Sequence, residues 1–556
     1  MNPNQKLSPA LLALMEKVRA RNAAAPTVDS VNEVNEVNTV AEVTHATNQY
    51  GIDITYNAEQ SEFIHLASSG KSCVLIGAAG TGKTTCQKGA VLSLLQSGKI
   101  PVIADNLSHK YLRLNVPGIV LTSFTRRAVR NLKRAMSDDL KDNCITIHKL
   151  LEYQPVQYEI YDEEQDKYKM TMRFEPTRNS VNPLPPTIKT IVFDESSMIS
   201  VELYNQLLDA LPHEVQFIFV GDIQQLPPVF GSAILGFKLL ELPVVELTQV
   251  YRQALESPII ALATQIRNGI PIPPFEERIE QEHPTQGKLT LHPWKKKLHP
   301  DIALLTIAKF FTSAYDSNMY DPCEDQILIP FNKACGTDEL NKHIANHIAH
   351  THNRYVYEVI AGFNKHYFSV GDLVLFDKED AEIVSIVRNG TYLGKKPQHE
   401  STTLDYWGHN SAGTVAVADE FDLEQIDNFL AAAASESEEK VNISSHLVTV
   451  RMIDTGEEVT LDTAAEINSL ILSYALTVHK SQGSEWDRVF VVFHQSHNTM
   501  IQRELLYTAI TRAKKELYVI CEPDHFTKGV IAQKIKGTTL EEKAEYFKGK
   551  LASQAK

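Results

Sequence analysis

The stretch Ser72-Cys-Val-Leu-Ile-Gly-Ala-Ala-Gly-Thr-Gly-Lys-Thr84 decides the fold of this chain. Its apolar first part predicts a short buried strand over Ser72 to Ile76, and Lys83 to Leu95 predicts a helix with Gly98 just past its end. Between strand and helix stands a complete G-x-x-x-x-G-K-[ST] pattern. Glycines let backbone N–H groups close around phosphate oxygens, and the N-terminus of the helix adds partial positive charge. The stretch therefore predicts a phosphate-binding loop.

Two side chains of this loop have specific expected roles. Lys83 is expected to pair with the β- and γ-phosphates of a nucleotide, and the hydroxyl of Thr84 is expected to bind Mg²⁺. The other residues expected to contact the nucleotide are Gly77, Ala78, Ala79, Gly80, Thr81, Gly82 and Thr85.

Two further apolar runs end in polar residues suited to the same site. Ile191-Val-Phe-Asp-Glu195 predicts a strand followed by two carboxylates, of which Asp194 is expected to hold Mg²⁺ and Glu195 to deprotonate the attacking water. The run Phe219-Val-Gly-Asp-Ile-Gln-Gln225 follows, and the amide of Gln225 is expected to sense the γ-phosphate. Such acidic strand ends belong to the sheet that carries a phosphate-binding loop.

The alternation of strands and helices indicates the fold class. β-rich runs at 119–123, 190–193, 215–220, 326–329, 488–493 and 517–521 are each joined by loops or helices, including helices from Asn332 and over Arg503 to Arg512. Alternation of this kind is typical of parallel sheets flanked by helices. We therefore predict an α/β fold with two such units. Strands are also expected over His366 to Phe376 and, with a turn at Thr455-Gly456, over His446 to Leu461.

Composition limits the class of protein. A chain of 556 residues exceeds one hydrophobic core, so two to four domains are expected. No apolar run reaches the length of a membrane span, and no signal-peptide pattern begins the chain. Six scattered cysteines favour a reducing compartment, and we expect a cytoplasmic monomer. The net charge of −15 leaves nucleic-acid binding open, because a binding channel needs only local positive groups such as those at 126–134.

With these segments in view, the chain resembles superfamily 1 DNA helicases of the Dda/RecD-like branch. The phosphate loop, Asp194-Glu195 and the Gly221–Pro228 segment resemble motifs I, II and III. The remaining motifs follow in order: Tyr56 to Gln60, Leu121 to Thr125 with Thr146 to Lys149, Leu247 to Arg252, Tyr474 to Glu485, and Tyr507 to Arg512.

The resemblance implies the roles of more residues. ATP would bind between two RecA-like domains, with Gln60 reading adenine and Glu485 near the sugar. Arg252 and Arg512 would act as arginine fingers that stabilise charge on the transferred phosphoryl group. The residues implied to contact single-stranded DNA are Phe124, Thr125, Thr146, His148, Thr477, His479 and Lys480. Phe124 departs from the proline common in this branch, so it either stacks on a base or packs in the core. Arg126 and Arg127 are also unusual, and either contact phosphates or face solvent.

The domain boundaries are expected as follows. Residues 1–50 form a short helix and a flexible linker, 51–250 the first RecA-like domain, 251–360 with 466–530 the second, 361–465 an inserted SH3-like β domain, and 531–556 a C-terminal tail. A β-hairpin insert is expected within 152–186, around an acidic turn at 162–166. It stands where the family carries its strand-separating pin, but its tip lacks an aromatic wedge. An acidic loop is expected at about 395–445.

These observations favour an ATP-dependent DNA helicase that moves 5′-to-3′ on single-stranded DNA, in replication, recombination or repair. Two alternatives in the same class remain open. One is a translocase that displaces proteins from DNA, and the other is a RecD-like motor subunit of a recombination nuclease complex. A third alternative, a P-loop switch or kinase unrelated to nucleic acid, leaves the motifs outside the nucleotide site unexplained.

Overall fold

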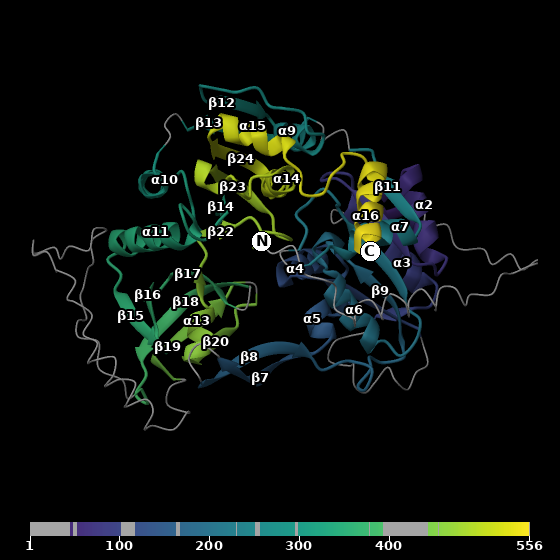
Figure 1. Cartoon of the computed structure of the whole chain (residues 1–556), viewed down its shortest axis with the longest axis horizontal. Coiled ribbons are helices and arrows are strands. Elements are labelled where there is room, and N and C mark those ends of the chain that lie inside the picture. Colours follow the sequence, from purple (N-terminus) through teal and green to yellow (C-terminus); the bar gives the residue numbers. More distant parts are fainter. Residues whose placement is uncertain are drawn as a thin grey trace, which may run out of the picture. The chain divides into compact units, whose positions relative to one another are not determined.

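The computed structural model describes residues 45–47, 53–101, 117–162, 167–228, 231–250, 256–294, 298–376, 379–392, 443–453 and 455–554 (Figure 1). The chain forms two compact units. One unit is Tyr56–Lys534, and the other combines Met1–Thr55 with Ile535–Lys556. The larger unit contains two parallel sheets and an antiparallel β domain.

The first parallel sheet contains the strand that precedes the phosphate-binding loop. Its order is β11-β3-β10-β9-β5-β4, and β6 also pairs with β5. β3 and β5 are buried along their whole length, as expected for strands covered on both faces. The strands are β3 (Cys73–Gly77), β4 (Ile100–Pro101), β5 (Gly118–Ser123), β6 (Cys144–Thr146), β9 (Ile188–Phe193), β10 (Gln216–Gly221) and β11 (Val244–Leu247).

The helices that belong to this sheet follow its strands along the chain. They are α2 (Ala58–Ser68), α3 (Lys83–Gln96), α4 (Arg126–Ala135), α5 (Ile147–Leu150), α6 (Val201–Ala210) and α7 (Ile234–Glu241). Short 3₁₀ turns lie at η3 (Asp138–Asn143) and η4 (Ser196–Met198).

The second sheet has the order β12-β13-β24-β23-β14-β22 and is parallel apart from the β12–β13 pair. Successive side chains enter two different cores. Val489 and Val491 pack with α9, α14 and α15, while Phe490 and Val492 pack with α10 and α11. This alternation buries both faces.

The bounds of these elements are β12 (Ile279–His283), β13 (Gly287–Pro293), β14 (Asp325–Ile329), β22 (Ala475–Thr477), β23 (Trp486–Phe493), β24 (Ala513–Cys521), α9 (Pro258–Arg267), α10 (Pro300–Asp316), α11 (Thr337–Thr351), η6 (Gln495–His497), α14 (Arg503–Ile510) and α15 (Pro523–Ile531).

An antiparallel β domain is inserted between α11 and β22. Its order is β16-β15-β19-β18-β17-β21, with β20 paired to β19. Its core includes Val374, Ile383, Val450 and Leu461. Its elements are β15 (Val356–Ala361), β16 (Asn364–Ser369), β17 (Leu373–Phe376), β18 (Glu379–Arg388), β19 (Ile443–Met452), β20 (Glu458–Thr463), α13 (Ala464–Ser469) and β21 (Ile471–Leu472).

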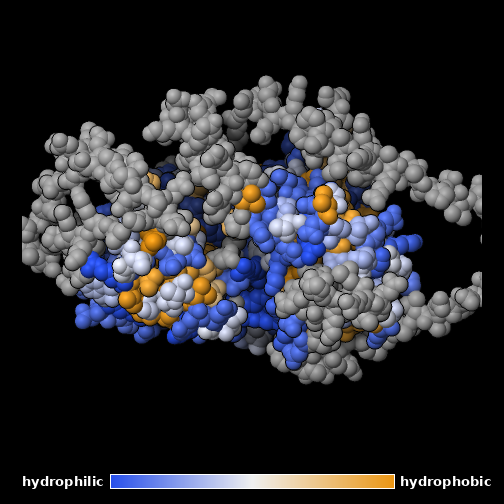
Figure 2. Space-filling model, turned by 90° about the horizontal axis from the view of Figure 1, so that it is seen from below, coloured by the Kyte–Doolittle hydropathy of each residue, from blue (hydrophilic) through white to orange (hydrophobic). Residues whose placement is uncertain are grey.

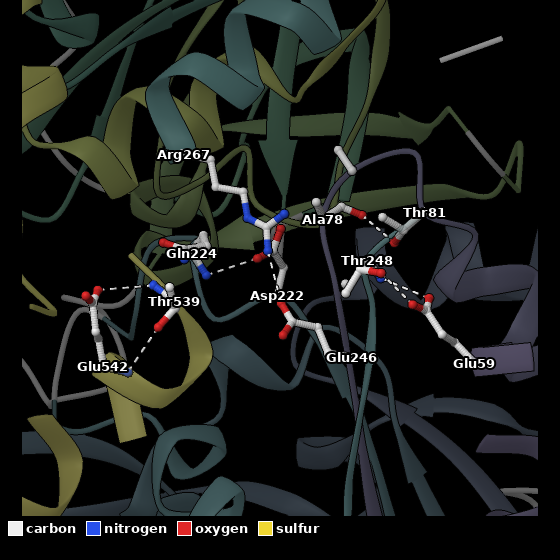
Figure 3. A network of polar contacts seen from close by, with 12 residues as sticks. Glu59, Ala78, Thr81, Asp222, Gln224, Glu246, Thr248, Arg267, Thr539 and Glu542 are labelled. Carbon is white, nitrogen blue, oxygen red and sulfur yellow. Dashed lines mark hydrogen bonds and ion pairs between the residues drawn. The ribbon is translucent and has the colours of Figure 1, made fainter. Parts of the chain in front are cut away.

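A separate antiparallel pair leaves the first sheet domain. β7 (Tyr153–Asp162) pairs with β8 (Lys167–Pro176) from Tyr153↔Pro176 to Asp162↔Lys167. In the smaller unit, β1 (His45–Thr47) pairs with β2 (Asp53–Thr55). The same unit contains α16 (Leu540–Gln554), whose start is capped by reciprocal bonds between Thr539 and Glu542 (Figure 3).

The prediction of an α/β fold with parallel sheets is confirmed, with local differences. The helix predicted from Asn332 begins at Thr337, because Ala334 and Cys335 have positive φ angles of 53° and 66° that no α-helix accommodates. The strand predicted over 366–376 is interrupted at Gly371, whose φ is +90°. The predicted tail at 531–556 contains a helix of 15 residues. The N-terminal helix, the acidic turn at 163–166 and the loop at about 395–440 lie outside the described residues.

The surface mixes apolar and polar side chains. Figure 2 shows orange apolar side chains interspersed with blue hydrophilic ones on the face drawn. No helix in the described part of the chain is long and apolar enough to cross a membrane.

The loop after β23 makes the folded state sensitive to acid. His497 is fully buried, its Nδ1 accepts from His494 N at 3.1 Å, and its Nε2 donates to the carbonyl of Cys335 at 3.1 Å. Burial lowers the pKa of His497 to about 4, below the ~6.5 of an unfolded histidine. The unfolded chain therefore takes up a proton that the folded chain rejects as the pH falls from 6.5 towards 4.

We predict that this histidine makes the free energy of unfolding fall by up to about 3 kcal/mol across that pH window. Urea titrations between pH 4 and 7 measure the effect. His497→Gln should flatten the slope, and substitution of the exposed His350 on α11 by Gln should leave it unchanged. Equal slopes in the wild type and His497→Gln would contradict the prediction.

Candidate nucleotide and nucleic-acid site

Three neighbouring strands of the first sheet end at the same edge. β10 pairs in parallel with β3 on one side and with β9 on the other. The last residue of β3 is Gly77. Asp194 directly follows β9, and Asp222 directly follows β10. The carboxyl edge of a parallel sheet is where ligands bind in open α/β folds. The pairing therefore brings the phosphate loop and two acidic segments together.

The phosphate loop is shaped by its glycines. Gly80 and Gly82 have φ angles of +79° and +85°, in the left-handed region that side chains disfavour. A Cβ on Gly77 would lie 2.4 Å from Thr81 Oγ1, so only glycine fits there. The ammonium of Lys83 donates to the carbonyls of Gly77 and Ala78 at 2.8 and 2.9 Å. Lys83 thus lies folded over its own loop, where it can reach an anion in the cradle.

The two adjacent carboxylates after β9, Asp194 and Glu195, lie in unfavourable environments. Burial, followed by the neighbouring carboxylate of Glu195, raises the pKa of Asp194, and Lys83 opposes the shift. Glu195 has a left-handed φ of +50°. Its Oε2 is buried with no hydrogen-bond partner among the described residues. A strained, unsatisfied carboxylate is rare in folded proteins and marks a position whose partner is a ligand or water.

These groups fit a magnesium nucleotide. Thr84 offers an exposed hydroxyl at the start of α3, and Asp194 offers a carboxylate within electrostatic reach of Lys83. Hydroxyl and carboxylate oxygens are ligands that Mg²⁺ prefers. The Glu195 oxygen that lacks a hydrogen-bond partner would then accept a hydrogen bond from a ligand or water at this site.

The segment after β10 adds polar groups to the same sheet edge. Asp222 Oδ1 accepts from Gln224 N at 3.0 Å, and the buried Oε1 of Gln225 has no partner among the described residues. Arg267 of α9 points towards Asp222 and pairs with Glu246 at 3.3 Å (Figure 3). Arg267 was missed by the sequence analysis, because an arginine in the last turn of a helix ordinarily indicates only a favourable C-terminal charge.

The structure places the other predicted nucleotide residues unevenly. Glu485 is exposed, pairs with Lys514 at 3.6 Å, and lies close enough to raise the pKa of Asp194. Arg512 is buried, and its hydrogen bonds to backbone carbonyls go to Thr508 and Ser484, at 3.0 and 3.1 Å. In this structure, the guanidinium of Arg512 is therefore engaged by the backbone of Thr508 and Ser484. Arg252 lies outside the described residues.

Gln60 has a structural role that the sequence analysis missed. It is fully buried, and its Oε1 accepts from Asn57 N at 3.1 Å while Asn57 Oδ1 accepts from Gln60 N at 2.8 Å. This reciprocal pair is a capping box at the start of α2. The Asn-x-x-Gln spacing was the available signal. Contact of Gln60 with adenine stays a prediction.

Two of the predicted DNA residues near the first sheet, Phe124 and His148, form a row of neighbouring aromatic rings with Tyr153. The rings of Phe124 and His148 are 5.4 Å apart, and those of His148 and Tyr153 are 4.9 Å apart, both edge to face. Phe124 is partly exposed, so it is not enclosed in the core. Thr125 and Thr146 cap α4 and α5 by accepting from Ala128 N and Lys149 N. Tyr153 had not been predicted as a site residue.

The predicted DNA residues of the second sheet lie in a tight turn after β22. Thr477 Oγ1 accepts from Lys480 N at 3.3 Å. Burial lowers the pKa of both His479 and Lys480, and Lys534 further lowers that of His479. The Lys480 side chain is nevertheless exposed and available to an anion.

α4 connects this turn with the β domain. Arg127 is buried and pairs with Asp380, Arg126 pairs with Glu379 at 3.1 Å, and Arg130 reaches Asp380 at 3.3 Å. The expectation for Arg127 is therefore corrected, because it is buried and pairs with a carboxylate more than 250 residues away. Arg126 is exposed, so its solvent-facing alternative holds although it pairs with Glu379.

Gly483 lets the turn after β22 approach α4. Asn131 Nδ2 donates to Gly483 O at 2.8 Å, and a Cβ on Gly483 would lie 2.7 Å from Ala128 Cβ. The φ of Gly483 is +77° and that of Gly456, where nothing lies within 4 Å, is +72°. The two glycines thus share backbone strain but differ in packing.

We predict that Gly456→Ala costs about 1 kcal/mol through backbone strain, and that Gly483→Ala costs more, because its Cβ also clashes with Ala128. Only Gly483→Ala should also weaken single-stranded DNA binding, because it pushes the Thr477–Gly483 turn away from α4. Thermal unfolding and fluorescence anisotropy with a labelled oligothymidine measure the two effects. Equal DNA affinities in the two variants would refute the docking role.

Comparison with known proteins agrees with this layout. A family model described as an AAA domain matches residues 60–231, and one described as a UvrD-like helicase C-terminal domain matches residues 472–520. The first match contains the phosphate loop and both acidic segments, and the second contains the turn after β22 and α14.

Two helicases match along most of this chain. The ATP-dependent RecD2 DNA helicase of Deinococcus radiodurans is 27% identical over 83% of this chain and 48% of its own length. The ATP-dependent DNA helicase dda of enterobacteria phage T4 is 22% identical over 80% of this chain and 93% of its own. The chain thus spans about half the length of the RecD2 relative.

Among solved structures, a Pif1 helicase from Candida albicans overlaps with a TM-score of 0.40 at 15% identity, covering 90% of this chain and 100% of its own. A Bacteroides Pif1 helicase in complex with ADP-AlF3 and single-stranded DNA gives 0.44 at 15% identity, covering 89% and 98%. Overlaps this loose support no conclusion here. The family models and the helicase relatives confirm that the chain resembles superfamily 1 helicases of the Dda/RecD-like branch.

Proposed function

We propose that this chain is an ATP-dependent DNA helicase that moves 5′-to-3′ along single-stranded DNA and couples ATP hydrolysis to strand separation. The observation that carries the proposal is the convergence of the Lys83 loop, the orphaned Glu195 carboxylate and the Asp222 segment at one sheet edge. The two helicase relatives support the assignment of this site to DNA-dependent ATP hydrolysis.

In this proposal the residues of the first sheet perform the hydrolysis. The loop from Gly77 to Thr85 surrounds the phosphates, and Lys83 leaves its carbonyl partners to neutralise them. Thr84 and Asp194 would hold Mg²⁺, which would neutralise negative charge on the phosphates when bound. Glu195 orients the attacking water and takes its proton.

Further polar residues complete the proposed site. Gln225 donates its side-chain amide N–H to the γ-phosphate, Glu485 lies towards the sugar, and Gln60 towards the base. Arg512 would act as an arginine finger only after its guanidinium leaves the carbonyls of Thr508 and Ser484, so a local rearrangement must accompany its use. Arg252 has the same proposed role.

The proposed DNA track joins both sheets. The Phe124–His148–Tyr153 row offers ring faces and edges to bases, while Lys480 and His479 offer positive or donor groups to phosphates. Thr125, Thr146 and Thr477 place these segments by capping and turn bonds. Base stacking with phosphate contacts is how single strands are held without sequence preference.

The proposed domain organisation follows the sheets. The first parallel sheet corresponds to one RecA-like domain and the second to the other, at about 51–250 and at 251–360 with 466–530. The antiparallel β domain would be the SH3-like insert of the family, since it interrupts the second sheet between β14 and β22. The β7–β8 pair would be the strand-separating pin.

Strand separation on matched partial duplexes tests the function. We predict ATP-dependent unwinding of a duplex with a 5′ single-stranded tail, little unwinding of the 3′-tailed duplex, and none by Lys83→Ala. Unwinding of only the 3′-tailed duplex would overturn the polarity. ATP hydrolysis stimulated by single-stranded DNA without unwinding of either duplex would indicate a protein-displacing translocase or a motor subunit that requires partners.

The aromatic row gives a second prediction. Phe124→Ala should weaken oligothymidine binding by about 1–3 kcal/mol, the usual worth of one stacked base. The dependence of log Kd on log salt should stay at the wild-type slope, because no phosphate contact is lost. Anisotropy titrations at several salt concentrations measure both, with substitution of the exposed Phe363 by Ala as control. Wild-type affinity in Phe124→Ala would remove Phe124 from the track.

A further inference from the structure

One buried tyrosine joins the phosphate loop to the segment after β10. Tyr507, in the middle of α14, is 1% exposed. Its hydroxyl accepts from the backbone N–H of Ala79 at 3.0 Å and donates to Asp222 Oδ2 at 2.7 Å. Both ends of this contact therefore lie in the proposed nucleotide site, while the tyrosine itself belongs to the helix that packs on the second sheet.

The direction of the two bonds is fixed by chemistry. Burial raises the pKa of Tyr507 well above its usual value, and Asp222 adds to the shift, so the hydroxyl keeps its proton. That proton can only go to the carboxylate, because Ala79 N is itself a donor. The lone pairs of the hydroxyl therefore occupy an N–H of the phosphate loop.

Two further side chains bind the end of the same segment. Thr508 Oγ1 accepts from Leu226 N at 2.9 Å, and Gln482 Nε2 donates to Leu226 O at 2.8 Å. Gln482 belongs to the turn that contains His479 and Lys480, the proposed DNA contacts. Asp222–Leu226 is thus held at its start by Tyr507 and at its end by Thr508 and by that turn.

We propose that Tyr507 is a positioning residue that couples occupancy of the phosphate loop to the DNA-binding turn, and this rests on the proposed function. N–H groups of the loop are the donors that close on phosphate oxygens. The Tyr507 hydroxyl occupies one of them, at Ala79, so a nucleotide oxygen that uses this N–H must displace it. When the hydroxyl is displaced, its hydrogen bond to Asp222 also changes. The Asp222–Leu226 segment then moves, and the hydrogen bond between Leu226 O and Gln482 transmits this movement to the DNA-binding turn.

A purely structural role makes the opposite prediction for one measurement. If the hydroxyl only held the domains together, its loss would loosen the phosphate loop and weaken nucleotide binding. If it competes for Ala79 N–H, its loss frees that donor and strengthens nucleotide binding. The sign of the change in nucleotide affinity therefore separates the two roles.

The test compares Tyr507→Phe with Tyr320→Phe in the full chain. Tyr320 is equally buried, and its hydroxyl donates to the carbonyl of Tyr474 at 3.2 Å, so the control also loses one buried hydrogen bond. Three quantities are measured: the Kd of a fluorescent ADP analogue, amide hydrogen exchange without nucleotide in peptides covering 75–82 and 222–228, and the ratio of kcat with single-stranded DNA to kcat without it.

For Tyr507→Phe we expect a two- to tenfold lower Kd, about the worth of one hydrogen bond. We also expect faster exchange in both peptides and a several-fold smaller ratio of kcat values. Tyr320→Phe should match the wild type in all three. A raised or unchanged Kd in Tyr507→Phe would overturn the coupling role, whether or not exchange is faster.

A second variant covers the case in which Tyr507→Phe fails to fold. Thr508→Val removes the acceptor of Leu226 N and the hydroxyl that donates to Glu504 O within α14, but leaves both hydrogen bonds of Tyr507 in place. It should therefore speed exchange in peptide 222–228 and lower the kcat ratio with the ADP Kd unchanged. An unaltered ratio with faster exchange would overturn the link to the DNA turn. If single-stranded DNA does not change the rate of ATP hydrolysis by the wild type, the proposed function fails. The exchange and affinity measurements then still test the role of Tyr507.

Discussion

Parallel pairing of β3, β10 and β9 is the constraint on which the site depends. The register aligns Gly221 with Ile76 and Phe219 with Phe193, so the phosphate loop and the acidic segments must emerge side by side. Burial of these strands fixes that register, because a slip of one residue would exchange the side chains of the two faces and mismatch the packing on both. The strained Glu195 backbone and its unsatisfied oxygen are tolerated only because the sheet around them is rigid.

The second sheet provides the residues that bridge the phosphate loop, the Asp222–Leu226 segment and α4. Its α14 places Tyr507 on the phosphate loop, and the turn after β22 places Gln482 on Leu226 and Gly483 on α4. The proposed nucleotide site and the proposed DNA-binding turn are therefore joined by hydrogen bonds between the two sheets. The ion pairs of Arg126, Arg127 and Arg130 with the first two residues of β18 extend this connection to the β domain.

Local patterns made much of this predictable. The phosphate loop could be found because Gly77 admits no side chain and the strand–loop–helix order is contiguous. Parallel sheets followed from alternating strands and helices. Contacts between distant segments could not be found, since Tyr507 and Ala79 are 428 residues apart and no periodicity links them. The pairing of Arg127 with Asp380, and the use of Gln60 as a cap, similarly depend on packing that the residue types alone do not specify.

We propose that the sheet edge formed by β3, β10 and β9 hydrolyses ATP for movement on DNA. Steady-state ATP hydrolysis by the wild type and by Glu195→Gln, with and without single-stranded DNA, tests it most directly. The account predicts strong stimulation of the wild type by DNA. It also predicts a loss of roughly 10²-fold or more in Glu195→Gln, the usual worth of a general base, with nucleotide binding retained. Hydrolysis in Glu195→Gln at the wild-type rate would contradict the account.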